Sequence, residues 1–193
     1  PAATPRTAPA PTPAIGRSVI VDPLSGTTRI RRPGSHTFKI VRRALKAPVG
    51  SEFDTRRGSL VLTSALPGGR VQQARFGGAT FKVRQSRGGR GMTDIILTGD
   101  APAASAGRAG GVMAAAVPTR KKPPSLWAHD SHGRYRTFGR NSVATVRGTT
   151  WRTTELATGT LTQVTSGAVS VRDLRGGVSV MVRAGGRYLA RGA

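Results

Sequence analysis

Cysteine is absent from this chain, and aromatic residues, acidic residues and long apolar runs are all scarce. Without cysteine the chain has no disulfide framework and no thiolate zinc site, although it suits either a reducing or an oxidising compartment. No run of about 18 apolar residues is present, so the sequence predicts no membrane span. Aromatic residues are 5% of the total, and 26 glycines with 13 prolines make helices a poor expectation.

Acidic residues number eight and are scattered one or two at a time along the 193 residues. General acid–base catalysis needs two carboxylates brought together, and no spacing here predicts that. There is also no Gly-x-x-x-x-Gly-Lys-Ser/Thr phosphate loop. We therefore predict a protein that is not an enzyme and has no cofactor or metal, with most carboxylates paired to arginine. The acids are Asp22, Glu52, Asp54, Asp94, Asp100, Asp130, Glu155 and Asp173.

Basic residues dominate the charge. Lysine and arginine number 31, of which 26 are arginine, and the formal net charge is +23. Such a field attracts polyanions and is weakened by salt. Nucleic acid, anionic cell-wall polymers and anionic lipid headgroups all fit it, and an alternative is that arginine only keeps a glycine-rich surface soluble.

The N-terminal segment 1–14 is rich in proline, alanine and threonine, which predicts an extended tail of polyproline II type. The chain begins at Pro1, without a methionine and without a basic-apolar-small signal pattern. We read this as a mature terminus left by signal-peptide removal. The expected location is extracellular, or at the cell surface.

Short apolar alternations bounded by glycine and proline run through the remainder of the chain, which predicts an all-β fold. We expect two related β units, solenoid-like or sandwich-like, with a barrel as a further alternative. The units cover 15–98 and 126–193, and an Ala/Gly/Pro-rich linker or excursion covers 99–125. Strands are expected at 19–21, 28–31, 38–41, 59–63, 80–84, 93–98, 135–137, 142–146, 150–153, 160–164, 168–171, 178–182 and 188–189.

A repeated string supports the two units. Val-Arg-x-x-Arg-Gly-Gly occurs at 83–89 and again at 171–177, each time directly after a predicted strand. A looser match relates Phe53-Asp-Thr55 to Tyr135-Arg-Thr137. The two offsets, 88 and 82 residues, are nearly equal, which is typical of a diverged tandem duplication.

The second half contains a series of glycine-anchored strand motifs. They are Gly139–Trp151, with Gly148-Thr149 before the tryptophan, then Gly159–Val164, Gly167–Val171 and Ala184-Gly185. This series resembles the FecR-type domain of bacterial cell-envelope proteins over 139–189, and the likeness extends more weakly over 19–97.

The resemblance implies an extracytoplasmic all-β domain, often solenoid-like, that works by protein contacts. In the founding members it relays a signal to a membrane helix and a cytoplasmic anti-sigma segment, and neither part is in this sequence. The FecR-like domains found alone in secreted surface proteins are the closer comparison.

One cluster has residue types found in hydrolases and metal sites, His129-Asp130-Ser131-His132. Neighbouring residues of an extended loop point in different directions, and zinc usually has three or four protein ligands. We therefore interpret it as a polar turn. Trp127 and Trp151 are candidate glycan platforms, but Trp151 lies in a strand pattern that predicts a core position.

The segment Ser86-Arg87-Gly88-Gly89-Arg90-Gly91 resembles the RGG segments that bind nucleic acid. It occupies the same position as Arg175-Gly176-Gly177 in the second copy. We favour a turn in both copies, with Gly-Gly supplying the positive φ of a tight turn.

The leading functional hypothesis is a secreted, non-enzymatic structural protein that self-assembles, as a homo-oligomer or filament, through its N-terminal segment. The candidate assembly residues are Pro13, Ile15, Val19, Ile20 and Val21, which can add as a strand to a partner's sheet. The alternative is a basic extracytoplasmic module that binds an anionic wall polymer or nucleic acid. Its candidate contacts are Arg87, Arg90, Arg120, Lys121 and Lys122.

Overall fold

The computed structural model describes residues 11–99 and 122–192, and over these residues the protein is almost entirely β, as the sequence predicts. Most of the tail and the linker residues 100–121 lie outside the described residues. No helix in the described part of the chain is long and apolar enough to cross a membrane. The elements are β1 (Ser18–Arg31), β2 (Lys39–Ile40), β3 (Leu45–Pro48), β4 (Glu52–Ala65), the 3-10 turn η1 (Pro67–Gly69), β5 (Val71–Gly77), β6 (Thr80–Gln85), β7 (Thr93–Leu97), β8 (Ser125–Asp130), β9 (Tyr135–Phe138), β10 (Ser142–Val146), β11 (Thr150–Leu156), β12 (Gly159–Ser166), β13 (Ala168–Asp173), β14 (Ser179–Arg183) and β15 (Arg187–Arg191).

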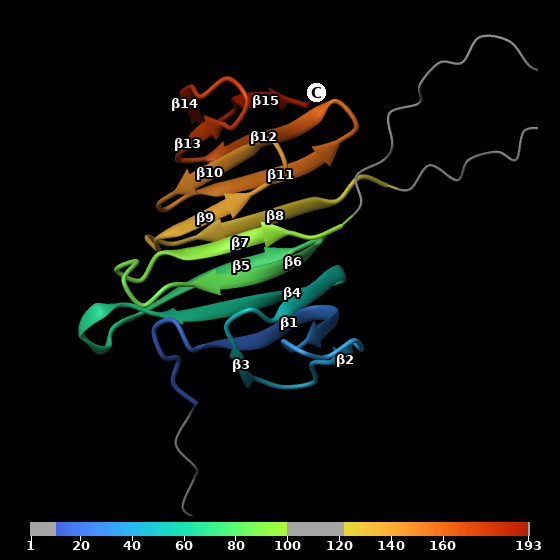
Figure 1. Cartoon of the computed structure of the whole chain (residues 1–193), viewed down its shortest axis with the longest axis vertical. Helices are drawn as coiled ribbons and strands as arrows, with labels where there is room; N and C mark the ends of the chain where they lie inside the picture. Colours follow the sequence, from blue (N-terminus) through green and yellow to red (C-terminus); the bar gives the residue numbers. More distant parts are fainter. Residues whose placement is uncertain (1–10, 100–121, 193) are drawn as a thin grey trace, which may run out of the picture.

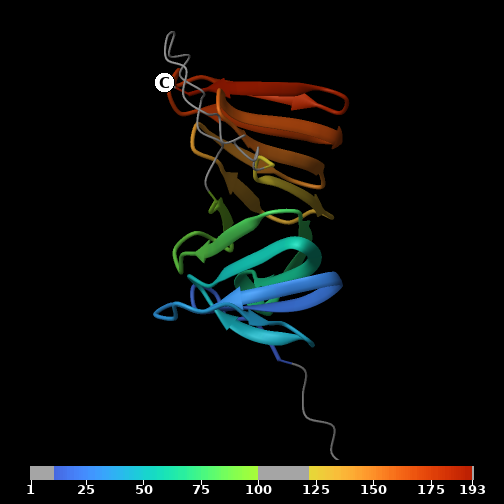
Figure 2. The ribbon, with the colours of Figure 1, turned by 90° about the vertical axis from the view of Figure 1, so that its right-hand side faces the viewer.

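The strands form one continuous sheet that folds back on itself (Figure 1). Twelve strands follow the path β14-β13-β10-β9-β7-β6-β4-β5-β8-β11-β12-β15, with β1, β2 and β3 attached at β4. β4 lies at the fold of this path, and β14 and β15, its two ends, come together at the other end of the molecule. The result is a nearly closed, barrel-like sheet, and Figure 2 shows it as a stack rising from β1 to β15.

Two long strands make the fold at the base of this stack. β1 and β4 pair antiparallel along almost their full length, and register shifts interrupt the pairing between Pro23 and Ser25 and between Thr27 and Arg29. Gly26 lies opposite Gly58, and a Cβ at either position would collide with the backbone of the other strand. Asp22-Pro23-Leu24-Ser25-Gly26 has the composition of a turn, but β1 runs through it as a bulged bend, because a bulge redirects a strand without ending its ladder.

An aromatic cluster occupies the centre of the core. Phe76 has its ring centroid 5.4 Å from that of Phe81, 5.8 Å from that of Tyr135 and 6.4 Å from that of Trp151. All four side chains are buried, and Trp151 donates its indole N–H to Thr137 Oγ1 at 3.1 Å. Trp151 is therefore a core residue, and the cluster joins the residues before 99 to those after 122.

The pairing pattern of the first half recurs in the second. β4 pairs with β5 and β5 with β8, and in the same way β11 pairs with β12 and β12 with β15. The hairpin β6–β7 has its counterpart in β13–β14, and these two hairpins contain the repeated Val-Arg-x-x-Arg-Gly-Gly strings. β8 pairs with β5 on one side and β11 on the other, so both halves share one sheet.

Candidate polyanion interface

The carboxylates of the described residues are nearly all occupied. Four form ion pairs: Glu52 with Arg31, Asp54 with Arg56, Asp94 with Arg136 and Glu155 with Arg140. Asp130 and Asp173 accept backbone N–H groups in turns. The hydrogen bond from Arg56 holds the pKa of Asp54 below its usual value. Consequently, few carboxylates are left to neutralise the other arginines.

Four arginines converge on one groove of about 500 Å³, which we call the arginine groove. Arg70 lies just before β5, Arg90 in the β6–β7 loop, Arg134 just before β9 and Arg147 just after β10. No acidic residue lines this groove; its lining is completed by Leu66, Pro67 and His132. None of the four arginines forms an ion pair within the described residues.

The backbone of the arginine groove is strained at two points. Arg90 has a φ of 48° and His132 a φ of 108°, and they are the non-glycine residues of positive φ in the described part of the chain. Both line the groove. Such conformations cost of order 1–3 kcal/mol each and persist where the surrounding structure holds them, often at functional sites.

A buried amide network supports the groove from below. Gln72 donates to the carbonyl oxygen of Gly91 at 2.8 Å, and its own side-chain oxygen accepts the N–H of Arg134 at 2.7 Å. Gln85 also donates to Gly91, at 3.2 Å, and to Thr93 Oγ1 at 3.1 Å. Gln72 therefore fixes both the loop that carries Arg90 and the segment that carries Arg134, and Gln85 adds a second bond to the Arg90 loop.

The cluster at residues 129–132 is a turn only in its second half: His129 and Asp130 end β8, and Ser131 and His132 form the bend that follows, at the edge of this groove. Asp130 is 1% exposed and accepts the N–H groups of Gly133 and Gly148, at 2.5 Å and 2.8 Å. His129 instead hydrogen-bonds Thr150 Oγ1 at 2.7 Å on the outer surface. The carboxylate thus fixes the corner between β8 and β9, and the described residues contain no group of three possible metal ligands.

The predicted polyanion contacts fall in three places. Arg90 lines the arginine groove, and Arg87 is exposed in the same loop. Lys122 lines a second groove, of about 600 Å³, together with Arg56, Trp127 and Arg152. Arg120 and Lys121 lie outside the described residues. Sequence reasoning missed Arg70, Arg134 and Arg147, because they lie next to strand ends with no motif around them.

The turn interpretation of the first repeated string needs a correction. Gly88 and Gly89 do not supply the positive φ there; Arg90 and Gly91 do, with Gly91 at 82°. In the second copy Gly177 has the expected positive φ, of 65°. The strained residue of the first copy is therefore Arg90, a basic residue that lines the arginine groove.

The predicted assembly residues belong to this chain's own sheet. Val19 and Val21 are fully buried and Ile20 nearly so; all three pair with β3, and Ile20 and Val21 also pair with β4. Pro13 and Ile15 are half-buried just before β1. Addition of this strand to a partner would therefore require exchange of β1 rather than docking of a free segment.

Comparison with known proteins gives no relative for this chain: no family model, no curated protein and no solved structure matches it.

Proposed function

We propose that this protein is a non-enzymatic, extracytoplasmic module that binds a polyanion. The arginine groove is the observation that supports this proposal most directly: four arginines and a histidine line one concave surface that lacks any acidic residue. Four guanidinium groups without carboxylate partners repel one another, and an anion in the groove removes that repulsion. Guanidinium also binds phosphate through two parallel hydrogen bonds.

The rigidity of the groove favours binding over surface solubility alone. Gln72 and Gln85 hold two of its loops from the buried side, so part of the ordering cost of binding is met before a ligand arrives. Arginines that only maintain solubility need no such support and no strained backbone.

The test is the salt dependence of binding to inorganic polyphosphate. Arg70→Gln combined with Arg134→Gln should weaken binding and lower the slope of log K against log salt by about 1.5, since each phosphate contact contributes roughly 0.7–0.9. Arg172→Gln combined with Arg183→Gln removes the same charge from exposed positions on β13 and β14, and should change the slope much less. Binding that is flat between low and physiological salt would exclude the proposal.

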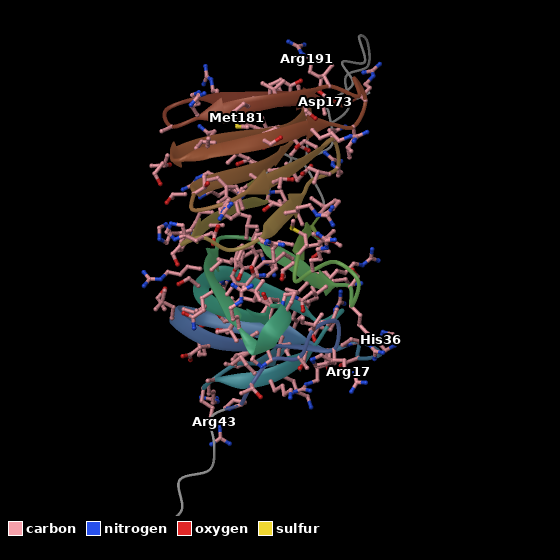
Figure 3. All side chains as sticks on the ribbon, turned by 90° about the vertical axis from the view of Figure 1, so that its left-hand side faces the viewer. Arg17, His36, Arg43, Asp173, Met181 and Arg191 are labelled. Atoms are coloured by element: carbon pink, nitrogen blue, oxygen red, sulfur yellow. The ribbon has the colours of Figure 1, made fainter. Side chains whose placement is uncertain are left out.

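Self-assembly as a surface structural protein is the second candidate function. Large exposed apolar residues gather at the two ends of the stack: Leu24 and Ile40 beside β1 and β2, and Leu174, Val178 and Met181 beside β13 and β14. Figure 3 shows Met181 at the end opposite to Arg43. β14 and β15 also each have one edge without a partner strand among the described residues.

Sedimentation velocity separates the two ways in which the chain can assemble. Deletion of residues 1–13 leaves β1 intact, so it should abolish polymers that depend on the tail and spare polymers formed by exchange of β1. Met181→Lys should abolish polymers that depend on the strand ends. A protein that stays monomeric at high concentration and physiological salt would exclude this function.

A further inference from the structure

A second basic surface lies on the outer face of β5, β8 and β11, beside the arginine groove. Arg75 on β5 is paired in register with His129 on β8, and Trp127 on β8 with Arg152 on β11. Arg75, His129 and Arg152 are exposed, and Trp127 is half-buried. We call these four side chains the β8 track; it contains no acidic residue.

Trp127 differs from the other tryptophan in its surroundings. Its indole edge lies over Gly77 of β5, where a Cβ would clash with it, and it borders the groove that also includes Arg56, Lys122 and Arg152. No described residue accepts a hydrogen bond from its indole N–H, whereas Trp151 is 1% exposed and donates to Thr137. Trp127 therefore offers an aromatic surface next to three cations and an open groove.

The hydrogen-bonding character of the β8 track selects among polyanions. The guanidinium groups of Arg75 and Arg152 and the indole N–H of Trp127 are donors without acceptor capacity, and in this track the imidazole of His129 alone can also accept. They match phosphodiester oxygens, which only accept. Acidic glycans carry many hydroxyl donors as well, and the track offers no carboxylate to receive them. An aromatic surface between cations is the arrangement by which proteins hold single strands, with bases stacked and phosphates paired.

The β8 track leads into the arginine groove. From Trp127 to Asp130, the last residue of β8, the chain advances three residues, which is about 10 Å at the rise of a β-strand, and His132 lies in the bend that follows. His132 lines the arginine groove, and the other end of the track lies in the Trp127 groove. The combined surface is long enough for a strand of several nucleotides, compared with the roughly 4–16 nucleotides that one single-strand-binding domain covers.

We propose that the β8 track and the arginine groove together bind single-stranded nucleic acid, with a base stacked on Trp127 and the backbone phosphates on Arg152, Arg75 and the groove arginines. This inference rests on the proposed polyanion-binding function and names its ligand class.

The experiment compares two probes on the same variants: a ten-nucleotide oligothymidylate, which has bases, and inorganic polyphosphate, which has none. Trp127→Ala should lower the affinity for the oligonucleotide about tenfold, because stacking contributes roughly 1–3 kcal/mol per base. Its affinity for polyphosphate should stay within about twofold. Trp127→Phe should keep most of the oligonucleotide affinity, because phenylalanine also has a flat ring.

Fluorescence adds a reading on the intact chain. The oligonucleotide should quench the half-buried Trp127, and polyphosphate should not, while the buried Trp151 reports that each variant is folded. An equal loss of affinity for both probes in Trp127→Ala would overturn the assignment of single-stranded nucleic acid as the ligand. Tighter binding of an acidic glycan than of the oligonucleotide would do the same. Either result would leave polyanion binding standing. Failure of the wild-type chain to bind either probe would overturn both proposals.

Discussion

Phe76 is the residue through which the two halves of the chain should lose stability together. Its ring lies against Phe81 in the first half and against Tyr135 and Trp151 in the second, and it is fully buried. Phe76→Ala removes three aromatic pairs and leaves a cavity that the sheet cannot close. Phenylalanine-to-alanine changes in cores cost roughly 3–5 kcal/mol, and we expect about 4 kcal/mol here.

Urea denaturation measures this effect with two probes. With an m-value of about 2 kcal/mol/M, the midpoint should fall by about 2 M, equally in far-UV circular dichroism and in tryptophan fluorescence. Both tryptophans belong to the second half, so a change made in the first half is read in the second. Val71→Ala on the same strand is the control, because Val71 is 51% exposed and its loss should cost at most about 0.5 kcal/mol.

The reasoning fails if the fluorescence transition keeps its wild-type midpoint while circular dichroism shows a separate, earlier one. That result would mean that 11–99 and 122–192 unfold as independent bodies despite the shared sheet and core.

Three further changes test the corners and charges of the fold. Asp130→Ala should cost about 2–4 kcal/mol in denaturant melts, because it leaves the buried N–H of Gly133 and the partly buried N–H of Gly148 without their acceptor, whereas Asp22→Ala at an exposed position should be near neutral. Gly58→Ala should lower the free energy of unfolding by about 1–3 kcal/mol, since its Cβ meets the backbone of Ser25 and Thr27. Gly88→Ala is the control and should cost far less, because the space around Gly88 is open. Equal melting temperatures for the two variants would contradict the bend at β1 and β4. Asp54 has a folded pKa that is lowered mainly by its hydrogen bond to Arg56, so it adds stability above its unfolded pKa of about 3.9, and that stability is lost as pH falls through the folded pKa. Asp54→Asn should therefore flatten the acid limb of the stability curve below about pH 4. The difference should stay under about 1 kcal/mol, because Arg56 is largely exposed.

The period-two patterns were sufficient to predict most of the sheet. β6, for example, places Phe81 and Val83 inward and the charged Lys82 and Arg84 outward, which is the pattern a half-buried strand requires. β5 was missed because its inward Gln72 is polar and is buried only through its hydrogen bonds to Gly91 and Arg134. β8 was missed because its large aromatic, Trp127, faces outward. The alternation of apolar and polar residues in the sequence therefore reveals neither β5 nor β8 as a strand.

The candidate site was far less predictable than the fold. Arg90 was named from the sequence because an RGG-like string surrounds it, but its partners come from residues 70, 134 and 147. Pairing between strands that are far apart in the sequence brings these residues together. One example is the parallel pairing of β7, which precedes residues 100–121, with β9, which follows them. No local signal encodes such a pairing, and the strain at Arg90 and His132 is equally a product of the assembled loops.

β8 is part of the strand pairing of both halves, and this restricts how the length of such a chain can change. β8 pairs with β5 in the first half in the same way that β15 pairs with β12 in the second. β8 also pairs with β11, so it belongs to both halves. One whole repeat runs from a strand to the matching strand of the other half. When such a repeat is removed or inserted, each remaining strand still has an equivalent neighbouring strand, and the sheet stays continuous. Removal of a fraction of a repeat leaves a strand whose buried face has no partner. Viable relatives of this chain should therefore differ in length by whole units, and a library of internal deletions should give soluble protein only at that spacing.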